Sequence, residues 1–147
     1  MARELLLIAL LAACSRDRPA TSERATEPSA GAAPLASKAF YRVDAGPAVA
    51  CTSGAPCEAR VVLTALGDYH INKDYPFKFV GEPAPTLALD GDAAFALTDA
   101  KHGTLTLRFT PRAAGAQTLA GIFKLSVCSD DTCEIEKPRL ALAVPVR

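Results

Sequence analysis

The sequence predicts an all-β domain, because short runs of alternating apolar and polar residues fill residues 38–147. Glycine, proline and aspartate separate these runs, as is typical of strands joined by turns. No stretch of twelve or more residues carries a clean helical stripe of apolar side chains. Short strands at this spacing favour a β-sandwich of the immunoglobulin-like kind, with a small β-barrel as the alternative.

Five runs are expected to form strands, and they cover residues 58–66, 75–80, 103–110, 119–127 and 139–146. In the third run Leu105, Leu107 and Phe109 share one face, while threonines and Arg108 occupy the other. The fourth and fifth runs alternate in the same way, so each strand is expected to bury one face. Residues 93–101 predict either a turn or two of helix or a short edge strand.

The N-terminus carries a short apolar run, residues 5–13, that ends in Leu11-Ala12-Ala13-Cys14. A membrane-spanning helix needs roughly 20 apolar residues, so nine are too few. The run is similar to a bacterial lipoprotein signal, in which the cysteine becomes the first mature residue and carries the lipid. We therefore expect a signal peptide over residues 1–13 and lipidation of Cys14; an ordinary cleaved signal that leaves Cys14 unmodified is the alternative.

Residues 14–37 are expected to form a flexible linker behind the lipid. The segment is rich in alanine, serine, threonine and proline and has no aromatic residue, so it cannot bury enough apolar surface to fold. Residues 38–147 then form one domain of ordinary size. By resemblance to enterobacterial lipoproteins, Ser15 in place of aspartate favours the outer membrane. The expected location is the bacterial cell envelope, facing the periplasm, with the membrane bound through the N-terminal lipid.

Lipidation of Cys14 leaves four cysteines, Cys51, Cys57, Cys128 and Cys133. An even number in an exported chain predicts two disulfides, because the compartment is oxidising. Four cysteines allow three pairings. Proximity favours Cys51–Cys57 and Cys128–Cys133, and the cross-pairings require the two ends of the domain to meet.

Several classes of function find no support in the composition. Sixteen basic residues balance sixteen acidic ones, which argues against a nucleic-acid partner. His70 and His102 have no metal-ligand spacing, so no metal site is expected. The chain also lacks a glycine-rich phosphate loop and a Gly-x-Ser-x-Gly elbow. We expect no cofactor and no ordinary hydrolase chemistry.

The pair Cys128 and Cys133 is the first candidate site. It lies at a connection between two strands, and strand alternation places Cys128 near the surface rather than in the core. Either the pair is redox-active, or it is a structural disulfide that crosslinks the two ends of a turn. Asp130, Asp131 and nearby glutamates should raise the thiol pKa. If the pair is active, its disulfide is therefore expected to be attacked by an incoming thiolate.

The second candidate is the aromatic segment over residues 67–79, which contains Tyr69, His70 and Tyr75. One interpretation is an aromatic cap beside a site. The other is a turn in which Tyr75 and Phe77 anchor the next strand. His70 has no recognisable nucleophile partner, which favours the turn over a catalytic role.

The order of these features resembles the N-terminal periplasmic domain of the thiol:disulfide interchange protein DsbD. A strand leads into Gly67-Asp68-Tyr69-His70-Ile71-Asn72, and later Lys124-Leu125-Ser126-Val127-Cys128 precedes Ser129-Asp130-Asp131-Thr132-Cys133 and a final valine-rich strand. The resemblance implies an immunoglobulin-like fold and assigns Cys128 and Cys133 to the exchanging pair. It also implies a partner, namely a periplasmic or membrane thiol–disulfide protein.

The chain departs from that family in three respects. Glu134-Ile135-Glu136 follows Cys133, where the family has proline, and Cys51 and Cys57 are additional and are assigned a structural bridge. Without a thioredoxin-like Cys-x-x-Cys domain, the chain is not expected to be a complete reductase. The leading hypothesis is thiol–disulfide exchange through Cys128 and Cys133. A non-enzymatic envelope binding module with two inert disulfides is the alternative, and a chaperone-like or inhibitor domain that pairs a partner strand comes third.

Overall fold

The structure is a computed structural model and describes residues 33–147. The predicted signal peptide, Cys14 and residues 15–32 of the predicted linker lie outside the described residues. The strands are β1 (Ala36–Lys38), β2 (Tyr41–Ala45), β3 (Cys57–Ala65), β4 (His70–Ile71), β5 (Lys78–Gly81), β6 (Leu87–Leu89), β7 (Ala94–Leu97), β8 (His102–Pro111), β9 (Gly115–Cys128), β10 (Cys133–Glu136) and β11 (Arg139–Val146). Across residues 33–147 no helix is long and apolar enough to span a membrane.

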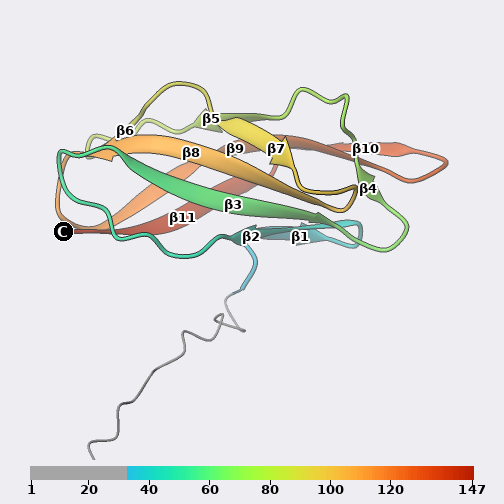
Figure 1. The fold of residues 1–147 in the computed structure, drawn as a ribbon, viewed down its shortest axis with the longest axis horizontal. Helices are drawn as coiled ribbons and strands as arrows, with labels where there is room; N and C mark the ends of the chain where they lie inside the picture. Colours follow the sequence, from blue (N-terminus) through green and yellow to red (C-terminus); the bar gives the residue numbers. More distant parts are fainter. Residues whose placement is uncertain (1–32) are drawn as a thin grey trace, which may run out of the picture. The chain divides into compact units, whose positions relative to one another are not determined.

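The strands form two antiparallel sheets that face each other as two layers (Figure 1). The first sheet has the order β1-β2-β3-β8-β6, and β7 also pairs with β8. The second sheet is built around β9. β5 and β11 flank β9 at residues 121–122, and β4 and β10 flank it at residues 127–128. The prediction of an all-β, immunoglobulin-like sandwich is confirmed.

All five predicted strands are present, with shifts at their ends. The run over residues 75–80 begins later than expected, at Lys78, because Tyr75 and Phe77 donate backbone hydrogen bonds within a turn. Of the two alternatives for residues 93–101, the structure has the short edge strand, β7. β1 begins at Ala36, and Leu35 packs against the core, so the ordered fold includes three residues that were assigned to the linker.

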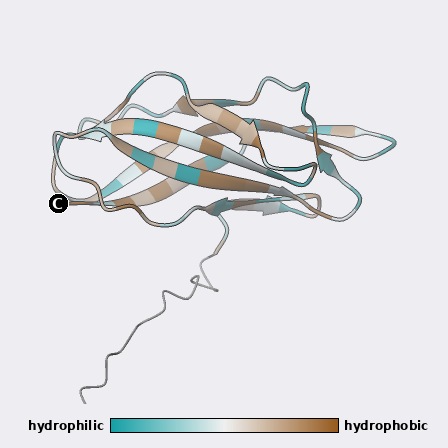
Figure 2. Ribbon diagram, in the orientation of Figure 1, coloured by the Kyte–Doolittle hydropathy of each residue, from teal (hydrophilic) through white to brown (hydrophobic). Residues whose placement is uncertain are grey.

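The core lies between the two sheets and follows from period-two alternation, because alternate side chains of each strand point to the same face. Figure 2 shows this alternation as bands of opposite hydropathy along β3 and β8. Phe109 of β8 and Phe123 of β9 are fully buried. Gly121 interrupts the inward row of β9 where the ring of Phe79 fills the space, and a Cβ there would lie 2.4 Å from Phe79 Cζ.

Different contacts close the two open sides of the sandwich. On one side Lys38 of β1 forms an ion pair with Glu136 of β10, with 2.5 Å between Nζ and Oε1. On the other side the rings of Phe77 and Phe95 stack with centroids 4.0 Å apart, and both rings lie near Phe123. A polar contact and an aromatic stack therefore hold the edges of the two sheets together.

Candidate functional site

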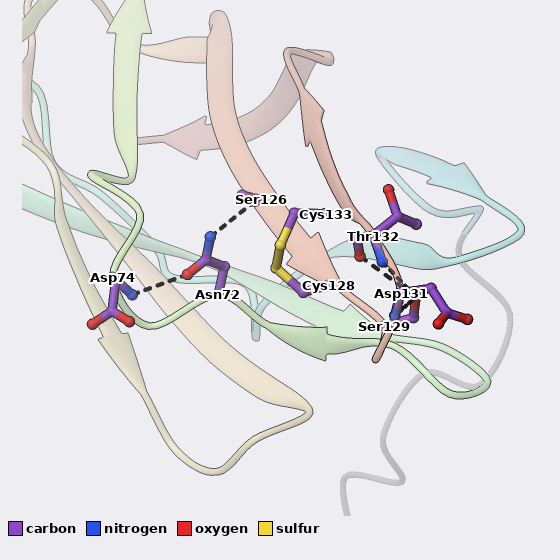
Figure 3. Close-up of a disulfide and its surroundings, with 8 residues drawn as sticks. All are labelled: Asn72, Asp74, Ser126, Cys128, Ser129, Asp131, Thr132 and Cys133. Atoms are coloured by element: carbon purple, nitrogen blue, oxygen red, sulfur yellow. Dashed lines mark hydrogen bonds between the residues drawn. A yellow bond between two sulfur atoms is a disulfide. The ribbon is translucent and has the colours of Figure 1, made fainter.

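The structure contains the two local disulfides, Cys51–Cys57 and Cys128–Cys133. These are the pairings that proximity favoured among the three alternatives. The bonds lie in different surroundings. Cys51–Cys57 joins a loop to β3, whereas Cys128–Cys133 joins β9 to β10 across a hairpin. The second bond is the candidate functional site, and Figure 3 shows its surroundings.

The hairpin places the two sulfur atoms face to face. Cys128 is directly opposite Cys133 in the register of β9 and β10. The next pair toward the turn is hydrogen-bonded, since Ser129 N–H donates to Thr132 O at 2.8 Å. Hydrogen-bonded and non-hydrogen-bonded pairs alternate in an antiparallel ladder, so Cys128 and Cys133 form a non-hydrogen-bonded pair, in which side chains lie closer. Their Cα atoms are 4.0 Å apart.

The serine that precedes the turn holds its backbone. Ser129 Oγ accepts hydrogen bonds from the N–H groups of Asp131 and Thr132, both at 3.3 Å (Figure 3). Asp130 and Asp131 form the exposed tip. The turn is therefore fixed by local hydrogen bonds that do not depend on the disulfide.

The two cysteines differ in exposure. Cys128 is only 6% exposed, whereas Cys133 is exposed. The prediction that Cys128 lies near the surface is wrong. Cys128 does alternate with the inward Val127, but the surroundings cover its face. His70 of β4 pairs with it on one side, and β10 pairs with it on the other.

Asn72 covers the position two residues before Cys128. Its side-chain amide donates to Ser126 Oγ at 3.4 Å, and its backbone N–H donates to Ser126 O at 3.1 Å (Figure 3). Ser126 is fully buried. Asn72 Oδ1 also accepts from Asp74 N–H at 3.2 Å, which fixes the turn that leads to β5. The segment after β4 therefore packs against β9 at Ser126, two residues before Cys128.

Lys101 holds the turn that precedes β4. Its ammonium group donates to Gly67 O at 2.6 Å and to Tyr69 O. Gly67 has a φ of 57°, a left-handed conformation that glycine adopts without a Cβ clash. Ile71 N–H donates to Ala100 O at 2.8 Å. The loop around Lys101 thus positions the short strand that covers Cys128.

The two histidines occupy separate places. His70 is exposed and contributes its backbone to the pairing with Cys128, in agreement with the turn interpretation. His102 Nδ1 lies 2.9 Å from Asp99 Oδ2, and this hydrogen bond is the main cause that lowers the pKa of the Asp99 carboxyl. Among residues 33–147, no group of three or more histidines, cysteines or carboxylates is arranged to hold a metal ion.

The Cys51–Cys57 bond links the two sheets. Cys51 is buried and forms an isolated parallel bridge with Val146 of β11. Cys51 N–H donates to Pro145 O at 3.2 Å, and Arg147 N–H donates to Cys51 O at 2.8 Å. Cys57 begins β3 in the other sheet. This disulfide therefore ties the edge of β11 to the first sheet, which fits a structural bond.

Neither a family model nor a curated protein matches the chain. Among solved structures, the chain is similar to the GAE domain of yeast GGA1, with 11% identity, a TM-score of 0.48, and coverage of 75% of this chain and 96% of that one. It is also similar to AggA, the major subunit of aggregative adherence fimbriae type I from Escherichia coli. That match has 13% identity, a TM-score of 0.39, and coverage of 73% and 94%. Both TM-scores are below 0.5, so neither likeness bears on the function of this chain.

Sequence reasoning found the cysteine pair but missed the residues that position the segment beside Cys128. Lys101 and Asn72 carry no motif, and their roles depend on contacts with Tyr69 and Ser126. The one signal in the sequence was the turn over residues 67–72 in the resemblance to the DsbD domain. That resemblance gave no role to Lys101.

Proposed function

We propose that this chain is a lipid-anchored envelope protein whose domain exchanges thiols and disulfides through Cys128 and Cys133. The observation that carries the proposal is the unequal exposure of the two sulfur-bearing residues. A disulfide reacts through the sulfur that an attacking thiolate can reach. Cys133 is open to solvent and Cys128 is not. The exposure of Cys133 at the first position of β10 favours attack at its sulfur over attack at the sulfur of Cys128.

In the exchange, a partner thiolate attacks Sγ of Cys133. A bond forms between the partner sulfur and Cys133, the Cys128–Cys133 bond breaks, and Cys128 leaves as a thiolate. A second thiol of the partner, as thiolate, then attacks the partner sulfur of this mixed disulfide. It releases Cys133 as a thiolate and leaves the partner oxidised. Two electrons pass from the partner dithiol to the domain, and the reverse sequence returns them.

The reduction potentials of the two disulfides test the proposal. The protein is equilibrated in glutathione buffers, its free thiols are alkylated, and mass spectrometry measures the oxidised fraction of each pair. We expect Cys128–Cys133 to be more oxidising than about −300 mV and Cys51–Cys57 to lie below that value. Potentials below about −300 mV for both bonds would leave a binding module with two inert disulfides and would overturn exchange.

The single-cysteine variants test which sulfur reacts. In Cys128→Ser the remaining Cys133 is exposed, and in Cys133→Ser the remaining Cys128 is covered. Cys128→Ser should therefore form a mixed disulfide with oxidised glutathione faster than Cys133→Ser. Equal rates, or a faster Cys133→Ser variant, would contradict attack at Cys133.

The anchor is a separate part of the proposal. Its support is the apolar run over residues 5–13 that ends in Leu11-Ala12-Ala13-Cys14. Mass spectrometry of the mature N-terminus should find Cys14 as the first residue, modified with diacylglycerol. Cell fractionation should place the protein in the outer membrane, and Cys14→Ser should release it. An unmodified N-terminus at another residue would exclude the lipid.

A further inference from the structure

Three lysines lie side by side on the outer face of the second sheet. Lys78 of β5 is directly opposite Lys124 of β9. On the other side of β9, the register of β10 ends at the pair Glu136–Leu125, so the next residue, Lys137, comes opposite Lys124. Lys78 and Lys137 are exposed, and Lys124 is half-buried. We call Lys78, Lys124 and Lys137 the lysine row.

The lysine row is unfavourable for the domain by itself, because like charges directly opposite each other destabilise a sheet. None of the ion pairs among residues 33–147 involves these three side chains. Lysine on an edge strand can prevent unwanted strand pairing, which accounts for Lys78. It does not account for Lys124, since β9 is the central strand. A ligand of opposite charge would explain the row.

The lysine row lies on the same face as the Cys128–Cys133 bond. Lys124 and Cys128 are four residues apart on β9, which corresponds to about 13 Å along the strand. Between them on β10, Ile135 is 59% exposed, the largest exposure among the large apolar side chains of residues 33–147. The face therefore presents, in order, a disulfide, an exposed apolar side chain and a row of positive charge.

We propose that this face is the docking surface for the exchange partner, and that the partner carries carboxylates about 13 Å from its reactive sulfur. The inference rests on the proposed exchange function and specifies the chemistry of its partner. The partner's thiolate reaches Cys133, an apolar side chain covers Ile135, and its carboxylates neutralise the lysine row. Opposite charges speed encounter and fix orientation more than they raise affinity. The charge row thus orients the partner's sulfur on the exposed cysteine.

Two synthetic peptides serve as probes. Each peptide has one cysteine, and a group of three identical residues begins four positions after it. These residues are glutamates in the first peptide and glutamines in the second. The protein is the chain from residue 14 onward with Cys14→Ser, so that no lipid is attached. The measurement is the second-order rate constant for attack of the peptide thiolate on the Cys128–Cys133 bond, which forms a mixed disulfide and frees one cysteine thiolate. Acid quenching traps this product for mass spectrometry. Each rate is divided by the rate at which the same peptide reduces hydroxyethyl disulfide, which corrects for the thiol pKa of the peptide.

We expect the glutamate peptide to react about 3- to 10-fold faster than the glutamine peptide at low salt. The difference should vanish at about 0.5 M NaCl. It should also vanish in the triple variant Lys78→Gln, Lys124→Gln, Lys137→Gln. The matched control removes the same charge by Arg60→Gln and Arg108→Gln in the first sheet and Arg112→Gln directly after β8, and it should keep the difference.

The outcomes separate this inference from the proposed function. If dithiothreitol reduces the pair but the two peptides react equally, the docking surface is wrong and exchange stands. If dithiothreitol fails to reduce the pair in the folded protein, exchange is wrong and the docking inference is wrong with it.

Co-sedimentation with phosphatidylglycerol vesicles tests whether the lysine row binds a membrane instead of a protein. Binding that the lysine triple variant loses, without a peptide preference, would assign the row to a membrane and overturn a protein partner.

Discussion

Cys133 and Cys128 face each other across the β9–β10 hairpin, yet only Cys133 is exposed. The difference comes from the neighbours of β9. Strand β4 pairs with β9 at Cys128, whereas among residues 33–147 no further strand pairs with the outer edge of β10, which carries Cys133. The two-residue strand β4 and the turn that holds it thus decide which of the two cysteines is covered. The first prediction concerns that turn.

Replacing Lys101 by methionine should loosen the turn before β4, because the carbonyls of Gly67 and Tyr69 lose their donor. We expect a loss of about 1 kcal/mol in the free energy of unfolding, measured with urea. The amide of Ile71 should exchange hydrogen faster. Dithiothreitol should reduce Cys128–Cys133 faster, because loosening β4 makes Cys128 a second point of attack beside the exposed Cys133. Lys73→Met is the control, since Lys73 is exposed and its side chain makes no hydrogen bond within residues 33–147. Unchanged exchange at Ile71 would contradict the role of Lys101.

Removing the Cys51–Cys57 bond should lower stability and leave exchange intact. The bond closes a short loop, and the chain-entropy model gives about 2 kcal/mol for a loop of this length. The double variant Cys51→Ala, Cys57→Ala should therefore unfold at lower urea, while the rate of Cys128–Cys133 reduction stays within about twofold. Cys128→Ala, Cys133→Ala is the matched control that abolishes exchange. A loss of exchange in the first variant would show that the two bonds are coupled.

The pKa of the Tyr41 phenol should be higher than that of a free tyrosine. Burial is the main cause that raises its pKa above 10.0, and the nearby Glu136 carboxylate adds to it. A raised folded-state pKa stabilises the domain fully below the unfolded pKa, and this contribution is lost as the pH rises through the folded value. Stability should thus fall above about pH 10 more in wild type than in Tyr41→Phe. The tyrosinate absorbance difference between the two proteins gives the pKa directly.

Glu136→Gln separates the two causes of that shift. The variant removes the carboxylate and keeps the burial of Tyr41. The pKa of Tyr41 should fall but stay above 10.0, because burial is the larger cause. Lys38, which lowers this pKa, remains in the variant, so a return to 10.0 would mean that burial does not exceed the effect of the Lys38 charge.

Reversing one charge in the lysine row should stabilise the domain. Lys124 has Lys78 opposite it on one side and Lys137 on the other, so Lys124→Glu replaces two repulsions by two attractions. We expect a gain of about 0.5–1 kcal/mol in the free energy of unfolding at low salt. Lys78→Glu, with one lysine opposite, should gain less. Equal gains, or a loss at Lys124, would contradict the register from which the row is inferred.

The alternation of apolar residues was sufficient to predict the sandwich, because strands such as β8 and β9 bury one face whatever they pair with. The burial of Cys128 was not predictable in this way. His70 lies far from Cys128 in the sequence and comes beside it only through strand pairing, and Asn72 comes beside the neighbouring Ser126 through hydrogen bonds.

The lysine row, like the burial of Cys128, could not be predicted from alternation along a single strand. Lys78 and Lys124 are unremarkable singly, and they become a pair only through the register of β5 on β9. The cysteine pairing was easier to predict, because each bond joins neighbours in the sequence. Contacts between neighbours can be inferred from spacing, while contacts between distant strands require the fold.

The hydrogen-bonded turn at Ser129 has a consequence for the reduced protein. Because the hydrogen bonds of Ser129 and Thr132 do not involve sulfur, we expect the two thiols to remain opposite each other when the bond is reduced. In the proposed exchange, a partner disulfide then reoxidises the pair: Cys133 forms a mixed disulfide with one partner sulfur, and the Cys128 thiolate attacks Cys133 and releases that sulfur as a thiolate. The second attack is intramolecular and has the advantage of a preset geometry over attack by a free thiol, so reoxidation does not require refolding.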